Sequence, residues 1–121
     1  MIKLTFALTR RPELTREAFQ AYWFDHHAPL VASVKDVLRI RRYVQLHSLP
    51  PEISETIQEV RGAPEGYDGV AQLWWDSMDE LMASARDPAG VAAGQRLLED
   101  EKTFIDLSRS PLWWGEEKVI F

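Results

Sequence analysis

Four short segments of this chain have the character of β-strands, and their order along the sequence restricts the folds that it can adopt. The first, residues 2–9, alternates large apolar side chains with polar or small ones. Because successive side chains of a strand point to opposite faces, this alternation predicts a strand with one buried face. Three further strands are predicted at residues 38–47, 69–75 and 113–121.

Helices are predicted between these strands. Thr15 is a suitable N-cap for a helix that runs to about Asp25. Ser77 and Glu80 match the capping box, in which a serine and a glutamate satisfy free N–H groups at a helix start. A further helix is expected over residues 89–101. The order strand, helix, strand, strand, helix, strand is that of the split βαβ, or ferredoxin-like, plan.

The predicted fold is therefore α+β, a ferredoxin-like βαββαβ unit whose four-stranded antiparallel sheet carries its helices on one face. Trp74-Trp75 and Trp113-Trp114 are adjacent pairs, so their members point to opposite faces of the sheet. We expect one member of each pair, together with Tyr43, on or near the face away from the helices. A second copy of the chain, packed sheet to sheet, would bury them.

Composition and charge exclude several classes of partner and chemistry. The chain has 121 residues, no cysteine and a net charge of -5, and we expect residues 1–121 to form one domain. The negative charge argues against nucleic acid and anionic membrane, which need a basic footprint. The absence of cysteine excludes disulfides and thiolate chemistry and favours a cytoplasmic location. No apolar run approaches the roughly 20 residues that cross a bilayer.

The segment Trp23–Leu30 is the strongest candidate for chemistry. Pro29 lacks the N–H that would bond the carbonyl of Asp25, so we expect it to interrupt the helix and to move Ala28 out of the helical region. A histidine titrates near neutral pH, and His27 at such a break, beside apolar side chains, is a candidate general acid or base. The alternative is a structural histidine that donates to a freed carbonyl.

No metal site is predicted. His26 and His27 are adjacent and point about 100° apart on a helix, so they do not serve one site together. His47 would be a third ligand, but the i, i+4 spacing of helical zinc motifs is missing. His26 is expected on the face of Tyr22, exposed or at an interface.

Several short motifs occur in a characteristic order along the chain. They are Arg11-Pro12, Glu17-Ala18-Phe19 before Tyr22-Trp23, His27-Ala28-Pro29-Leu30, Tyr43, Asp68-Gly69-Val70-Ala71 before Leu73-Trp74, Asp100-Glu101 before Phe104-Ile105-Asp106, and Glu116 or Glu117. In this set the chain resembles the EthD-like family of the dimeric α+β barrel group. The resemblance implies a homodimer whose two sheets close into one barrel, and no dedicated cofactor. Relatives of this family in the wider group include cofactor-free oxygenases, lactone isomerases and polyketide cyclases. Membership of the family therefore implies no single reaction.

These observations lead to a set of candidate site residues. His27 is the expected base, and Tyr43 is expected to hold a ligand oxygen as the other catalytic residue. The resemblance draws attention to Asp106, which either supports the chain before the last strand or orients His27. The residues expected to bind substrate are Trp23, Leu30, His47, Trp74, Trp75 and Asp106.

The sequence therefore predicts a cofactor-independent, oxidoreductase-like or isomerase-like enzyme for a small apolar metabolite, cyclic or aromatic, in degradative or polyketide-type metabolism. Oxygenation, isomerisation and cyclisation all fit, because each can begin with the removal of a proton. The alternative is a non-catalytic protein that binds a hydrophobic metabolite. Residues 48–67 form a long excursion rich in proline and glycine, and whether it acts as a lid stays open.

Overall fold

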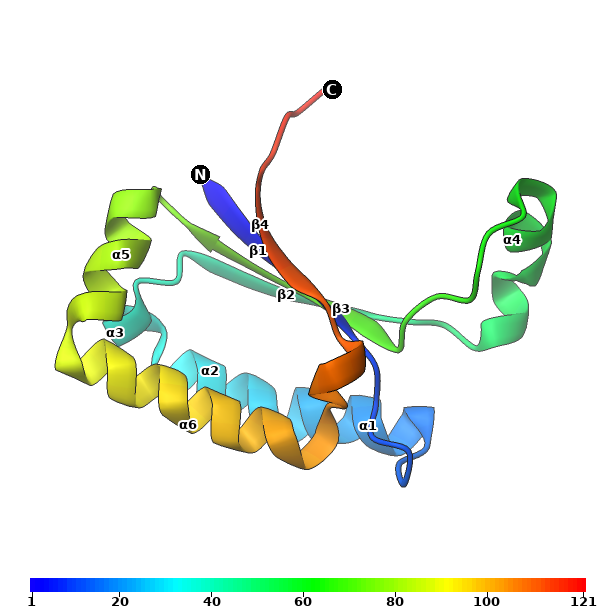
Figure 1. Ribbon diagram of the computed structural model, residues 1–121, viewed down its shortest axis with the longest axis horizontal. Helices are drawn as coiled ribbons and strands as arrows, with labels where there is room; N and C mark the ends of the chain where they lie inside the picture. The colour runs from blue at the N-terminus through cyan, green and yellow to red at the C-terminus, as the bar shows by residue number, and fades with distance from the viewer.

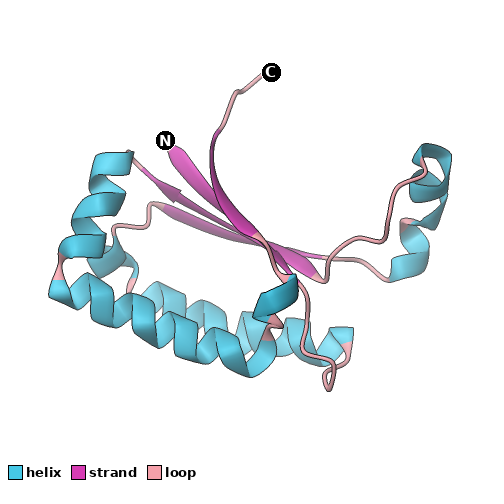
Figure 2. Cartoon of the chain, in the orientation of Figure 1, coloured by secondary structure: helices cyan, strands magenta, loops and turns pink.

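A four-stranded antiparallel sheet with helices on one face makes up the body of the protein (Figure 1; Figure 2). The computed structural model describes residues 1–121. The strands are β1 (Ile2–Leu8), β2 (Arg42–His47), β3 (Gly69–Trp75) and β4 (Leu112–Glu116). They lie in the order β2-β3-β1-β4, with every neighbouring pair antiparallel. The predicted ferredoxin-like fold is confirmed.

The helices follow the predicted order. They are α1 (Arg16–Tyr22), α2 (Ala28–Ser33), α3 (Lys35–Leu38), α4 (Glu55–Arg61), α5 (Met78–Arg86) and α6 (Pro88–Phe104). Helices α1, α2 and α6 run beneath the sheet, while its opposite face is open (Figure 1). No helix is long and apolar enough to cross a membrane.

At two of the predicted helix starts, the expected side chain accepts a hydrogen bond from a free backbone N–H group. Thr15 accepts a hydrogen bond from the N–H of Ala18, and Ser77 accepts one from the N–H of Glu80. These oxygens satisfy donors that a helix start leaves unpaired. Only half of the predicted capping box forms, because the carboxylate of Glu80 binds Arg39.

Pro29 does not interrupt the helix, contrary to the prediction from its missing N–H. Residues Trp23–His27 form a π-helical turn, and Ala28 keeps helical backbone angles (φ -59°, ψ -45°). The N–H of Ala28 donates to the carbonyl of Trp23, five residues earlier. Pro29 then lies in the first turn of α2, where no N–H is required. The wider turn lets the chain pass the proline without a break.

The register places one continuous apolar surface on the helix side of the sheet. Leu4 of β1 pairs with Leu73 of β3 and Trp114 of β4, and Leu73 pairs with Tyr43 of β2. The most deeply buried large side chains of the core are Leu8, Phe19, Trp23 and Phe104. The core thus has the sheet on one side, and α1, the π-helical turn and α6 on the other.

Several predicted boundaries shift. The second strand begins at Arg42 rather than residue 38, because α3 continues to Leu38 and Arg39 then adopts left-handed backbone angles. Helix α6 extends past residue 101 to Phe104, and β4 ends at Glu116 rather than at residue 121.

Residues 48–67 form an arm that carries α4 and projects away from the helical layer (Figure 1). The apolar side chains Ile53, Ile57 and Val60 of this arm are exposed.

Candidate functional site

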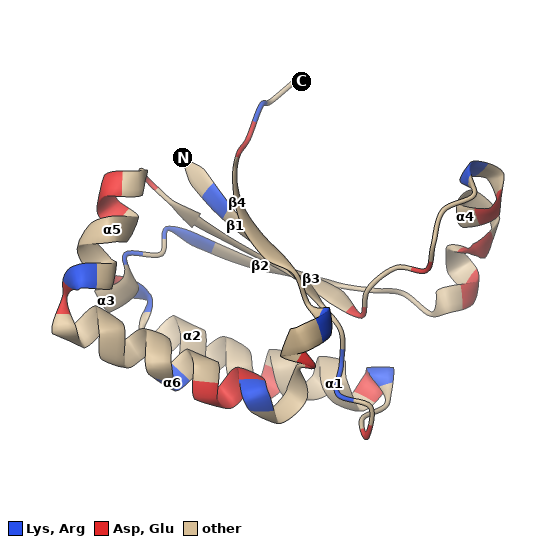
Figure 3. Ribbon diagram, in the orientation of Figure 1, with Lys and Arg blue, Asp and Glu red and all other residues tan.

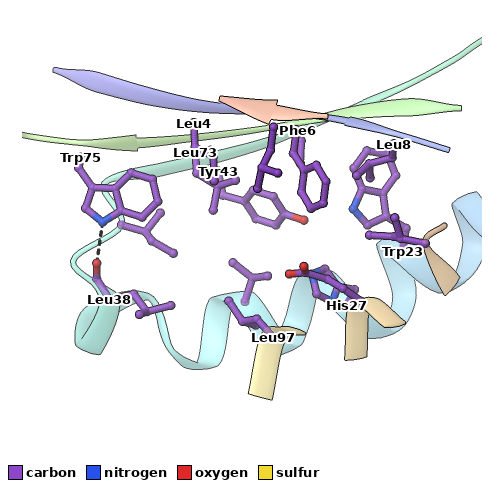
Figure 4. Close-up of a pocket in the computed structure, with 16 residues that line it drawn as sticks. Leu4, Phe6, Leu8, Trp23, His27, Leu38, Tyr43, Leu73, Trp75 and Leu97 are labelled. Atoms are coloured by element: carbon purple, nitrogen blue, oxygen red, sulfur yellow. Dashed lines mark hydrogen bonds and ion pairs between the residues drawn. The ribbon is translucent and has the colours of Figure 1, made fainter. Parts of the chain in front are cut away.

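An apolar cavity of about 140 Å³ lies between the sheet and the helices. Of the 16 residues that line it, 14 are hydrophobic. Leu4, Phe6 and Leu73 enter from the sheet, and Leu97 enters from α6 (Figure 4). The polar groups that reach the cavity come from His27, Glu101 and Tyr43. Few polar groups in a mostly apolar cavity are typical of small-molecule sites.

His27 projects into this cavity from the π-helical turn (Figure 4) and is only 5% exposed. Its Nδ1 lies 2.7 Å from Oδ2 of Asp100, and the hydroxyl of Tyr22 donates to Oδ1 of the same carboxylate at 2.6 Å. A carboxylate accepts hydrogen bonds, so Nδ1 of His27 carries the hydrogen. Nε2 of the neutral ring is then left with a free lone pair.

Burial lowers the pKa of His27, and the hydrogen bond and negative charge of Asp100 oppose this shift. The net direction is downward. The ring is therefore neutral at neutral pH, which is the form that accepts a proton. Phe104 packs on it, with ring centroids 5.1 Å apart. His27 is thus buried, held in one orientation and in the form that can accept a proton.

Glu101 lies beside His27 in the cavity wall. Oε2 of Glu101 is 3.9 Å from Nε2 of His27, longer than a hydrogen bond. Burial, and in second place the charge of Asp100, raise the pKa of Glu101 to about 7. A substantial fraction of this carboxyl group is therefore protonated at neutral pH, so it can donate a proton.

Glu101 was not among the site residues predicted from the sequence, although Asp100, Glu101 and Asp106 belong to a motif recognised there. Figure 3 shows the acidic stretch on the C-terminal part of α6. Asp100 and Glu101 are adjacent on that helix, so their side chains diverge by about 100°. One orients His27 while the other faces the cavity. The feature of the sequence that pointed to these roles is the pair of adjacent carboxylates. On a helix, adjacent side chains point in different directions, so the two residues have different surroundings.

Tyr43 enters the cavity from the sheet side, opposite His27 (Figure 4). Its hydroxyl oxygen accepts a hydrogen bond from Nε2 of Gln45 at 2.8 Å. The same amide nitrogen donates to the carbonyl of Trp23 at 3.0 Å. Burial raises the pKa of Tyr43 to about 12, so the phenol stays protonated. Because its oxygen already accepts a bond, its own hydrogen is available to a ligand oxygen.

The structure brings Trp23, His27, Tyr43 and Trp75 together at the cavity, as the sequence grouped them. Tyr43 does so from the helix side of the sheet, so the expectation that it lies on the opposite face is wrong. The alternation of β2 and its pairing with Leu73 place it inward.

Other predicted substrate-binding residues lie outside the cavity lining. His47 stacks on the outer side of Trp23, with ring centroids 4.6 Å apart, and Val31 rather than Leu30 lines the cavity from α2. Trp74 lies on the opposite face of the sheet, where Lys3 and Arg42 cover its ring.

Asp106 also lies outside the cavity lining, and of its two expected roles its contacts agree with the structural one. Its carboxylate accepts from the hydroxyl of Ser108, and its backbone carbonyl accepts from the hydroxyl of Ser110. Asp106 supports the connection before β4, and Asp100 holds His27 instead. No group of three His, Cys, Asp or Glu side chains is arranged to hold a metal ion.

Together, the sheet order and the lined cavity define a ferredoxin-like α+β protein with an internal apolar site. The EthD domain matches residues 11–108, and the chain belongs to the EthD family. Among curated proteins, the conidial pigment biosynthesis dehydratase EthD of Metarhizium robertsii is 25% identical over 118 residues. That match covers 95% of this chain and 81% of the relative.

Solved structures share the fold. An EthD family protein of Bacillus halodurans matches with a TM-score of 0.61 and 23% identity, covering 98% of this chain and 100% of that one. A dimeric ferredoxin-like protein of Bacteroides fragilis matches at 0.59 and 14%, covering 96% and 95%. SnoaB of Streptomyces nogalater, a cofactor-independent oxygenase, matches at 0.55 and 12%, covering 98% and 93%. At these identities the likeness shows a common fold.

Proposed function

We propose that this protein is a cofactor-independent enzyme that removes a proton from a small, apolar, cyclic substrate, with His27 as the general base. The observation that carries the proposal is Nε2 of His27, which lies at the wall of an apolar cavity while Asp100 holds the other ring nitrogen. A base that is buried, oriented and neutral at neutral pH is suited to proton abstraction.

The cavity supports a substrate of about one ring. Its volume of about 140 Å³ is close to that of an engineered apolar cavity of about 150 Å³ that binds benzene. The lining offers apolar contact over most of its surface and few polar groups. Tyr43 is the donor for a carbonyl or phenol oxygen, and it stabilises negative charge that develops there after proton loss.

Several reactions share this first step. Oxygenation of an electron-rich phenol, isomerisation, aldol-type cyclisation and dehydration all begin when a base removes a C–H or O–H proton. The name of the curated relative supports dehydration, and the cofactor-independent oxygenase among the structural neighbours supports chemistry without a cofactor on this fold.

We also propose that the protein works as a homodimer in which the open faces of two sheets meet. A structural neighbour of the same fold is dimeric. On the open face of this chain, Leu46 is 55% exposed and Trp113 is 52% exposed. Contact between two copies would remove both from water.

The test uses cyclohexanone as a minimal probe. In D₂O, the wild-type protein is expected to exchange the protons next to the carbonyl for deuterium, followed by NMR. His27→Ala should lose this exchange by at least about a hundredfold, since a general base contributes on that order or more. His26→Ala is the matched control, because His26 is exposed and stacks on Tyr22 outside the cavity.

Exchange at the wild-type rate in His27→Ala would refute the proposal, provided that circular dichroism shows both variants folded. If the wild-type protein binds cyclohexanone but never exchanges its protons, a non-catalytic binding role replaces the proposed one.

A further inference from the structure

We propose that Glu101 and His27 form an acid–base pair that eliminates water from the ring of a cyclic β-hydroxy ketone, taking the proton and the hydroxyl group from the same face of the ring. This inference rests on the proposed function and names its substrate class and a second catalytic residue. Removal of a proton alone needs His27 but has no use for Glu101.

The position of Glu101 is the first argument. Its carboxyl group enters a wall that is otherwise almost wholly apolar, where an ionised carboxylate is poorly solvated. Burial raises its pKa to about 7, so the protonated form is available at neutral pH. Hydroxide is a poor leaving group unless it is protonated as it departs, and a carboxylic acid beside the base supplies that proton.

The spacing is the second argument. Nε2 of His27 and Oε2 of Glu101 are 3.9 Å apart, and both come from the helical layer, facing the sheet. A flat ring held between sheet and helices therefore presents one face to both groups. A hydrogen on one ring carbon and a hydroxyl on the next are neighbours on that face, within reach of the pair. The geometry thus predicts a syn elimination.

The step balances without another reactant. Nε2 of His27 takes the proton from the carbon next to the carbonyl, and the electron pair of that C–H bond becomes the new C=C bond. The C–O bond to the hydroxyl breaks, and Glu101 gives its proton to the departing oxygen, which leaves as water. The hydroxyl of Tyr43 donates to the carbonyl oxygen meanwhile. The proton on Nε2 then returns to Glu101 across the 3.9 Å gap, through one water molecule, and restores both groups.

The experiment compares two reactions of single-ring probes. Dehydration of 3-hydroxycyclohexanone to cyclohexenone is followed by ultraviolet absorbance, and deuterium exchange into cyclohexanone reports on His27 alone. The wild-type protein should catalyse both. Glu101→Gln keeps the shape of the side chain but cannot transfer a proton. It should lose dehydration by about a hundredfold or more, and at least about tenfold more than it loses exchange.

Glu99→Gln is the matched control, because Glu99 lies two residues away on the same helix and outside the cavity lining. It should leave both rates unchanged. Thermal unfolding of each variant confirms that the protein is folded. In a probe labelled with deuterium next to the carbonyl, the label on the same face as the hydroxyl should be lost, and the label on the opposite face should remain in the early product.

The outcomes separate this inference from the proposed function. If Glu101→Gln dehydrates at the wild-type rate, or if the wild-type protein exchanges cyclohexanone but never dehydrates the hydroxyketone, the acid–base pair is refuted and the base role of His27 stands. Loss of the label on the opposite face refutes the syn geometry. If the wild-type protein does neither reaction, the proposed function fails with it.

Discussion

At the scale of single residues, the site depends on two adjacent carboxylates with different surroundings. Asp100 accepts hydrogen bonds from Tyr22 and His27, whereas Glu101 faces an apolar wall. Hydrogen bonds stabilise a negative charge and burial without them destabilises it. The same helix therefore carries an orienting carboxylate and a proton donor side by side.

The raised pKa of Glu101 predicts a pH dependence of stability. Because its folded-state pKa of about 7 exceeds the ordinary 4.5, the folded protein binds more protons than the unfolded chain between these values. The stabilisation is complete below pH 4.5 and is lost as the pH rises through 7. The lowered pKa of His27 acts in the opposite direction, mainly below about pH 7.5, where the histidine of the unfolded chain still binds a proton.

The lowered pKa values of His27 and His47 still oppose the Glu101 effect for about one pH unit above 6.5, so a comparison with Glu101→Gln is needed to isolate the carboxyl group. Relative to Glu101→Gln, we expect the free energy of unfolding of the wild-type protein in urea to fall by about 1 kcal/mol between pH 6.5 and about pH 8.5. Glu99→Gln, with an exposed side chain, should show the same decrease relative to Glu101→Gln as the wild-type protein does. Equal pH profiles for wild type and Glu101→Gln would show that the carboxyl group is ionised throughout.

At the scale of elements, the π-helical turn and the start of β3 position the site together. The turn moves the carbonyl of Trp23 to a place where Ala28 and Gln45 both donate to it. The ring of Trp23 lies against Gly69, so close that a Cβ there would be 2.4 Å from the ring and 2.9 Å from the carbonyl oxygen of Leu46. The helix approaches the sheet this closely because Gly69 has no side chain.

Gly69→Ala should therefore destabilise the protein by about 1–3 kcal/mol, because the added methyl group displaces Trp23 or the strand. Urea unfolding measures the change. Gly94→Ala is the matched control: beyond the local backbone of α6, no atom lies within 4 Å of a Cβ at this exposed position, and alanine favours helices. It should be neutral or stabilising by up to about 1 kcal/mol. A Gly69→Ala protein with wild-type stability would contradict this account of the packing.

At the scale of the whole molecule, the sheet has one face covered by helices and one that is open (Figure 1). Trp74 on the open face is covered locally by Lys3 and Arg42, and its indole N–H donates to Glu117. Leu46 and Trp113 have no comparable cover. The proposed dimer follows from this contrast.

Leu46→Glu should convert the dimer into a monomer, because the charge would be buried at the contact without a partner. Light scattering coupled to size-exclusion chromatography measures the mass. The matched control is Ile57→Glu on α4, a residue 58% exposed on the projecting arm. It should stay dimeric. A monomeric wild-type protein, or a dimeric Leu46→Glu variant, would contradict the proposed interface.

Much of the fold could be predicted from local patterns in the sequence alone. The alternation of residues 69–75 predicted β3 with its observed bounds, and the caps Thr15 and Ser77 predicted two helix starts. Alternation and capping are local, because they depend on neighbouring residues and on the period of each element. The predicted break in the helix at Pro29 was wrong, because the π-helical turn there is supported by Gln45, a residue of another element.

The sequence by itself determined the order of strands and helices, the alternation of side chains along each strand and the presence of a histidine among apolar residues, since these follow from periodicity and residue type. Only the tertiary structure decided that Asp100 rather than Asp106 holds His27, and that Glu101 faces the cavity. The physical reason is that the role of a carboxylate depends on what surrounds it. The packing of α6 against the π-helical turn sets those surroundings, and residues some seventy positions apart in the chain meet there.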